Sequence, residues 1–207
     1  VDLDLGGDPV LEGIPTDERL RMFQAGGDDP GLIETYFQYG RYLLMGSSRY
    51  PAQLPANLQG IWNKDFSAPW NSDYHTNINL QMNYWLPDPA NLGQCFEPLI
   101  RLAEEASVTG AQMAAAHYGA GGWVMHHNTD IWRAAGPIDG ARWGLWPTGA
   151  AWLCVQLWDH AVFSGRPAPL VRRLYPLIEG AVRFILDTLV ALPGTDRLVT
   201  CPSVSPE

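Results

Sequence analysis

The chain has 207 residues, of which 46% are apolar, enough to bury a sizeable core in one large domain or two small ones. Its 22 acidic residues outnumber its 13 basic ones, which gives a formal net charge of −9. We expect no nucleic-acid partner and no anionic-membrane partner, because both need a cationic protein surface. The composition favours an uncharged ligand.

Three cysteines, Cys95, Cys154 and Cys201, stand far apart, without the paired spacing of a zinc site or the density of a disulfide framework. Buried free thiols are expected at these positions. No apolar run approaches the ~20 residues that span a bilayer, and the first residues do not form a signal peptide. Because the chain starts at Val1 and stops at Glu207, directly after a proline, we expect a piece of a longer protein.

The first third of the chain predicts a lead-in followed by a helix and a long loop. Residues 1–29 are rich in Gly, Asp and Pro, with one short helix predicted over residues 16–24. Apolar side chains recur at helical spacing over residues 31–45, directly after Pro30. Three prolines and a glycine interrupt residues 46–73, which predicts a loop, and loops of this length are more often functional.

Three further helices are predicted at about residues 94–118, 147–164 and 176–191, the last after a short turn from Pro169. Pro176 fits the first position of that helix better than an interior position. A second long loop separates the first two helices, and the tail RLVTCPSVSPE follows the last. No strand pattern is sustained over several elements, so the predicted class is all-α.

The stretch HTNINLQMNYW places a polar side chain at every second position: His75, Asn77, Asn79, Gln81 and Asn83. Such alternation indicates a strand, but asparagine is depleted in strands and the surroundings offer no partner strand. We expect an extended segment that becomes a helix near Asn79. In that geometry His75, Asn77 and Asn79 point the same way.

Three neutral polar groups on one wall suit a water molecule or a sugar hydroxyl, because an amide both donates and accepts hydrogen bonds without adding charge. Seven of the nine tryptophans lie between positions 62 and 146, mostly in the loops, and flat aromatic faces suit a sugar ring. Two alternatives stay open. The amides can instead satisfy loop backbone, and any one tryptophan can belong to the core.

Two short motifs also carry candidate chemistry. HHNTDIWR allows a metal site through His126, His127 and Asp130, but adjacent histidines reach one ion poorly, so a hydrogen-bonding pocket wall is preferred and no metal is expected. In the final SPE, Ser205 can cap a helix that starts at Pro206, or Glu207 can be an acid beside a cleft. A helix start lowers a carboxyl pKa whereas a general acid needs it raised, so an apolar pocket must dominate.

Six blocks of this sequence together resemble glycoside hydrolase family 95, chiefly α-L-fucosidases that act on α-1,2-linked fucose. The resemblance covers residues 30–207 through ETYFQYGRYLL, LPANLQGIWN, YHTNINLQMNYW, HHNTDIWR, WGLWPTGAAWLC and LVTCPSVSPE. It implies an (α/α)6 barrel in two rings, preceded by a β-sandwich and a helical linker. Residues 1–29 are then the linker, and residues 30–207 are a partial (α/α)6 toroid of about five helices.

The resemblance also implies roles for individual residues. The family inverts the anomeric centre with a glutamic acid as general acid, which matches Glu207, and with two asparagines that position water, which match Asn77 and Asn79. The residues matched to the sugar pocket are His75, His127, Asp130, Trp132 and Trp146. The implied partner is a fucosylated oligosaccharide, and no cofactor is implied.

The family's base is an aspartate in a later barrel segment, so the remainder of the polypeptide is needed to complete the barrel and its pair of carboxyl groups. We therefore expect no turnover by residues 1–207 alone, and aggregation or a molten state through exposed helix faces. The alternatives are a sugar-binding module without catalysis and an α-L-galactosidase on the same barrel. A phosphorylase is disfavoured because no Arg or Lys cluster offers a phosphate site.

Overall fold

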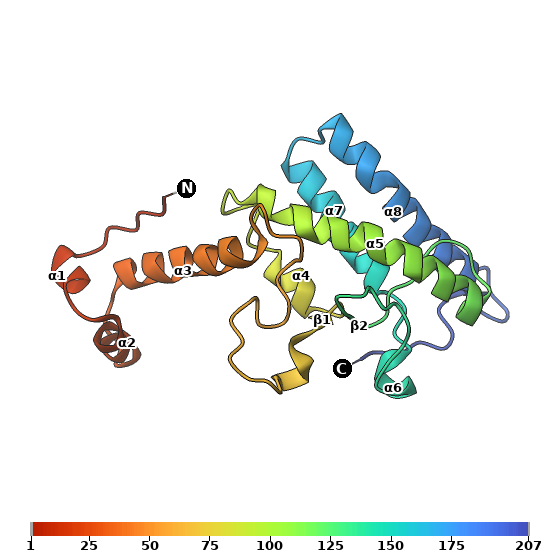
Figure 1. Ribbon diagram of the computed structural model, residues 1–207, viewed down its shortest axis with the longest axis horizontal. Coiled ribbons are helices and arrows are strands. Elements are labelled where there is room, and N and C mark those ends of the chain that lie inside the picture. Colours follow the sequence, from red (N-terminus) through yellow and green to blue (C-terminus); the bar gives the residue numbers. More distant parts are fainter. Residues whose placement is uncertain (1, 207) are drawn as a thin grey trace.

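The computed structural model describes residues 2–206 as a mostly helical molecule (Figure 1). This confirms the all-α class. An arm at the N-terminal end contains α1 (Pro9–Glu12), α2 (Thr16–Gln24) and α3 (Pro30–Ser48). The body contains α4 (Asn79–Asn83), α5 (Glu97–Met113), α6 (Ala141–Gly144), α7 (Gly149–Phe163) and α8 (Ala168–Thr188).

The two longer helices of the arm are joined by a buried ion pair. The Arg19 guanidinium in α2 donates two hydrogen bonds, of 2.8 and 2.7 Å, to the carboxylate of Asp29. The same carboxylate accepts a 2.9 Å hydrogen bond from the backbone N–H of Leu32, so Asp29 also caps α3. Pro30 then occupies the first turn, where a missing N–H costs nothing. The predicted helices over residues 16–24 and 31–45 are confirmed.

The helix predicted over residues 94–118 is built from three connected pieces: the 3-10 turn η2 (Gly93–Phe96), then α5, then the π-helical turn η3 (Ala114–Tyr118). Gly119 ends it with a left-handed φ of 62°, a conformation that glycine adopts without a steric penalty. The buried face of α5 includes Leu99, Leu102 and Ala106, which have no exposed surface.

Helices α7 and α8 form a hairpin against α5, and the main core lies between these helices and α4 (Figure 1). The prediction that Pro176 begins the last helix is wrong, because α8 runs through it from Ala168. An interior proline costs about 3 kcal/mol. Leu174 and Leu177 on either side of it are buried in the core, and this burial holds the helix together across the proline.

The predicted end of the last helix is also too late. Helix α8 stops at Thr188, and the next residues form a hairpin of β3 (Val190–Ala191) and β4 (Leu198–Val199). β-branched Val190 and Val199 pair across it. Cys95 and Cys154 are buried free thiols as expected, but the prediction is wrong for Cys201, which is exposed just beyond this hairpin.

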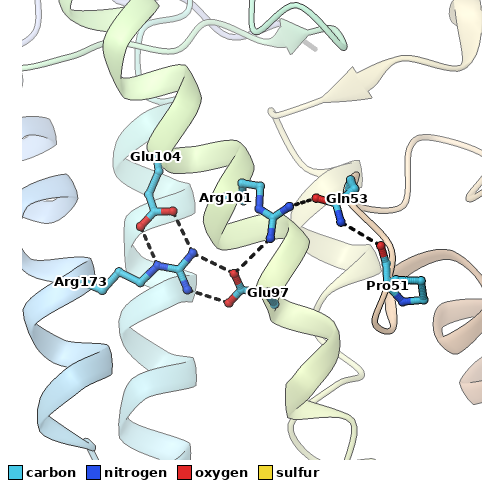
Figure 2. A network of polar contacts seen from close by, with 6 residues as sticks. All are labelled: Pro51, Gln53, Glu97, Arg101, Glu104 and Arg173. Carbon is cyan, nitrogen blue, oxygen red and sulfur yellow. Dashed lines mark hydrogen bonds and ion pairs between the residues drawn. The ribbon is translucent and has the colours of Figure 1, made fainter.

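A network of charged side chains joins α5 to α8 and to the first long loop (Figure 2). The Arg173 guanidinium in α8 contacts both carboxylate oxygens of Glu104, at 2.6 and 2.8 Å, and both of Glu97, at 2.6 and 3.0 Å. Arg101 contacts Glu97 at 3.7 Å and also donates to Gln53 in the loop. Hydrogen bonds from Arg173 hold the pKa of Glu97 below its usual value.

The long helices, α3 of the arm and α5, α7 and α8 of the body, make the mostly helical architecture that is expected for part of a helical toroid. The helices of the body keep large apolar side chains exposed: Val155 and Phe163 on α7, and Val182 and Leu186 on α8. Within residues 2–206, no helix combines the length and the hydrophobicity that crossing a membrane requires.

Candidate active site

Two segments that are distant in sequence pair beside α4 to form the base of the candidate site. Strand β1 (Tyr74–His75) runs antiparallel to β2 (Asn128–Thr129). The backbone N–H of Thr76 extends this pairing with a 2.7 Å hydrogen bond to the carbonyl of His127. The first and the second long loops therefore meet at one place, and the expectation that the stretch from His75 has no partner strand is wrong.

The extended part of this stretch is shorter than predicted. It ends at His75, residues 76–78 form a turn, and α4 begins at Asn79 as expected. The turn is held by the buried Gln81, whose side-chain N–H donates a 2.7 Å hydrogen bond to the carbonyl of Thr76. Asn83 donates similarly to the carbonyl of Asn57, at 2.9 Å. Gln81 and Asn83 thus follow the backbone-satisfying alternative.

The other three polar side chains of the stretch, His75, Asn77 and Asn79, line one cavity of about 750 Å³. This size lies within the usual range of small-molecule sites. The other described residues that line it are Leu58, Gln59, Pro69 and Trp70 from the first loop, His127, Asp139 and Trp143 from the second, and Pro206.

Two imidazoles in the cavity wall each face a carboxylate. His75 Nδ1 lies 3.4 Å from Asp73 Oδ1, and His127 Nε2 lies 3.2 Å from Asp139 Oδ2. The two rings are near one another, with centroids 6.5 Å apart. His127 Nδ1 is buried and has no hydrogen-bond partner among the described residues. The wall can therefore offer a ligand several directed donors and acceptors.

The electrostatics of this wall favour a neutral ligand. Burial, reinforced by the nearby carboxylates of Asp139 and Asp130, raises the pKa of Asp73 to about 6. Among the described residues that line the cavity there is no Lys and no Arg. An anionic ligand would meet carboxylates without a compensating cation, whereas the amides of Asn77 and Asn79 can bind hydroxyl groups.

The neighbouring His126 serves the fold. It is fully buried, its Nδ1 contacts the carbonyl of Ala135 at 2.6 Å, and its Nε2 contacts the hydroxyl of Tyr118 at 2.7 Å. Burial lowers the pKa of His126, which favours the neutral ring. Residues 2–206 contain no group of three or more His, Cys, Asp or Glu side chains placed to hold a metal ion.

Comparison with known proteins matches residues 1–207 to the family described as "Glycosyl hydrolase family 95 catalytic domain". The chain belongs to this family. It is 46% identical over 213 residues to "Alpha-L-fucosidase 2" of Arabidopsis thaliana, an alignment that covers 100% of the chain and 25% of that protein. It is 41% identical over 199 residues to "Probable alpha-fucosidase A" of Aspergillus niger, with 93% of the chain and 25% of the relative covered. The chain thus spans about a quarter of the length of these curated relatives.

In this family 95 chain, three residues predicted for the sugar pocket lie outside the described cavity lining. The Asp130 carboxylate accepts hydrogen bonds from the backbone N–H groups of Trp132 and Ala134, at 2.8 and 3.1 Å, and so shapes its own loop. The Trp132 side chain is 80% exposed. Trp146 is half-buried, with its ring edge-on to Trp152 at 6.3 Å between centroids. Their sugar-binding roles stay predictions.

Glu207 lies outside the described residues, but Pro206, its neighbour in the sequence, lines the family 95 cavity. Sequence reasoning missed Asp73 and Asp139 as parts of the site. Asp73 could have been found as the acid two positions before His75. Asp139 carried no such signal, because it lies outside the HHNTDIWR block. It stands in a turn directly before Gly140, where its own φ is left-handed, at 62°.

Proposed function

We propose that this chain forms part of the catalytic domain of an inverting α-L-fucosidase, which hydrolyses terminal α-1,2-linked L-fucose from oligosaccharides or glycans. One observation carries the proposal: His75, Asn77 and Asn79 share a cavity with Pro206, directly before Glu207 in the sequence. The two relatives are named as an α-L-fucosidase and a probable α-fucosidase, which supports fucose as the sugar.

In the proposed reaction, Glu207 protonates the glycosidic oxygen of the leaving group. Asn77 and Asn79 hold a water molecule through their amide groups, and an aspartate from outside this chain removes its proton. Inversion needs these two carboxyl groups roughly 6.5–9.5 Å apart, so that the water fits between the base and the sugar.

The cavity wall supports a sugar substrate in two further ways. Trp70 and Trp143 line it, and their flat apolar faces suit the C–H face of a pyranose ring. The imidazole rings of His75 and His127 can each donate a hydrogen bond to a hydroxyl group from a protonated nitrogen or accept one at an unprotonated nitrogen. This pairing of aromatic faces with neutral polar groups matches a monosaccharide better than an ionic ligand.

The test compares two substrates in the full-length protein. Glu207→Gln should lower the turnover of 2′-fucosyllactose by roughly 10²–10⁴-fold, the usual cost of losing a general acid. It should act almost normally on α-L-fucosyl fluoride, because fluoride leaves without protonation. Asn77→Ala should slow both substrates, because both need the positioned water. The control is Glu179→Gln, on the exposed face of α8.

Three results would contradict the proposal. The first is near-normal turnover of fucosyllactose by Glu207→Gln, which would remove this residue as the acid. The second is sugar binding by the unsubstituted full-length protein with no hydrolysis of either substrate, which would favour a binding module. The third is initial release of α-L-fucose, seen by NMR, which would show retention of configuration instead of inversion.

A further inference from the structure

The part of the first loop that carries Trp70 has an unusual backbone. Trp70, Asn71 and Ser72 are consecutive residues other than glycine, and all three have a left-handed φ, of 47°, 56° and 51°. This conformation is unfavourable for side chains other than glycine, and least so for asparagine. It persists only where the surrounding structure fixes it, and such residues are concentrated at functional sites. The left-handed turn over residues 70–72 therefore indicates a function for a side chain that it presents.

Two contacts of Asn57 tie this left-handed turn to the body of the molecule. The Oδ1 of Asn57 accepts a 3.1 Å hydrogen bond from the Ser72 hydroxyl. The backbone carbonyl of Asn57 accepts a 2.9 Å hydrogen bond from the Asn83 side chain in α4. The turn is thus anchored to the helix whose first residue, Asn79, lines the cavity.

The side chain that the turn presents to the cavity is that of Trp70, which stands at its open side. Trp70 lines the cavity, yet it is 73% exposed. In the same lining, His127 is 7% exposed, and Asn77 and Asn79 are half-buried. The lining therefore has an enclosed part, which contains the two amides proposed to hold the attacking water, and an open part, which contains Trp70.

The proposed reaction assigns a different sugar to each part. An enzyme that removes a terminal sugar encloses that sugar, whereas the rest of the oligosaccharide must extend toward solvent. The fucose then lies at the enclosed part, beside Asn77 and Asn79, and the sugar on the other side of the cleaved bond lies at the open part. A cavity of about 750 Å³ is in the range that holds drug-sized ligands, which are larger than one monosaccharide. It has room for both sugars.

We propose that Trp70 is a specificity-determining residue, whose indole ring stacks on the leaving-group sugar next to the cleaved fucose. A flat indole face suits the apolar C–H face of a pyranose. Because the anchored turn already holds the backbone of Trp70, less conformational freedom is lost when the sugar binds. This inference rests on the proposed fucosidase function for the identity of the substrate.

The first experiment measures binding by calorimetry in the full-length protein, inactivated by Glu207→Gln. Adding Trp70→Ala should weaken the binding of 2′-fucosyllactose about tenfold, the size of one aromatic contact, and should weaken that of free L-fucose much less. Phe66→Ala is the matched control, because Phe66 is a fully exposed aromatic residue of the same loop outside the described cavity lining. It should leave both affinities unchanged.

The anchor of the turn gives a second variant that keeps the indole ring. Ser72→Ala removes the hydrogen bond to Asn57 and should weaken the binding of 2′-fucosyllactose about threefold, again with a smaller effect on L-fucose. The double variant of Trp70 and Ser72 should be no worse than Trp70→Ala alone, because Ser72 acts through the position of the ring. Additive losses would contradict this coupling and the proposal with it.

The second experiment measures turnover in the full-length protein with Glu207 intact. Trp70→Ala should lower kcat/KM for 2′-fucosyllactose about tenfold, should lower that for α-L-fucosyl fluoride much less, because this substrate has no leaving sugar, and should keep the Tm. No release of fucose by the unsubstituted protein would contradict the fucosidase proposal. Equal losses on the two substrates, equal weakening of the two ligands, or a lower Tm, which would show that the ring packs against the rest of the polypeptide, would overturn the role given to Trp70.

Discussion

Replacing Asp73 with asparagine should stabilise the folded protein at neutral pH and leave its stability unchanged in acid. The substitution keeps the size of the side chain and an acceptor for Asn128, but it removes the negative charge. Burial and two neighbouring carboxylates raise the pKa of Asp73 from 3.8 to about 6. The charge at this position therefore destabilises the fold.

The size and the pH range of the effect follow from linkage. Below pH 3.8 Asp73 is protonated in both states, and between pH 3.8 and about 6 only the folded state holds the proton. The free energy of unfolding therefore falls as pH rises through this window and levels off above it. The shift sets an upper limit of about 3 kcal/mol, and solvent contact of the carboxyl group lowers the expected effect to about 1 kcal/mol.

The assay is scanning calorimetry of the full-length protein and its Asp73→Asn variant from pH 4 to pH 8. We expect Tm values that agree near pH 4 and a variant that melts about 1–3 °C higher at pH 8. The control Asp65→Asn, which replaces an exposed acid in the same loop, should show no such pH-dependent difference. A variant that is less stable at pH 8, or equally shifted at every pH, would refute the electrostatic explanation.

Three further predictions concern the fold. Arg173→Ala should lower the free energy of unfolding in urea by about 1–2 kcal/mol, because Arg173 bridges two carboxylates of α5. The neighbouring exposed Arg172 does not, so Arg172→Ala should lower it by almost nothing, and equal losses in the two variants would contradict this explanation. Gly122→Ala should lower the free energy of unfolding by about 3 kcal/mol or more, because the added Cβ would lie 1.9 Å from the Gly180 carbonyl oxygen. Gly119 has a left-handed φ but open space around it, so Gly119→Ala should lower it by only about 1–2 kcal/mol. Cys154 should resist iodoacetamide at pH 8 until the protein unfolds, because burial raises its pKa to about 12; rapid labelling of the folded state would argue against that burial.

Local signals in the sequence predicted most of the helices. The periodic apolar side chains of α3 and α7, and the proline at the start of α3, are features of single segments, so they can be identified without knowing the fold. The wrong helix start predicted at Pro176 also came from reading a single segment without the fold. The local preference of this proline favours a helix start, and only the burial of Leu174 and Leu177 in the assembled core reverses that preference.

The candidate site was predictable where its residues are close in sequence. His75, Asn77 and Asn79 line one cavity as predicted, but a turn at residues 76–78 brings them there, in place of the extended segment from which the prediction was made. The pairing of β1 with β2 and the approach of Asp139 to His127 depend on contacts between distant loops. A strand of two residues leaves no detectable pattern, so its partner is visible only in the folded chain.

The pairing of the two loops also determines when the pocket can form during folding. Thr76 reaches the carbonyl of His126 across 50 residues of chain, and Asp73 reaches Asn128 across 55. Closing such spans is slow compared with winding a helix, because chain entropy is lost before any contact compensates for it. A refolding protein should therefore recover its helical circular dichroism first, and the binding of the proposed fucosylated ligand only in a later kinetic phase.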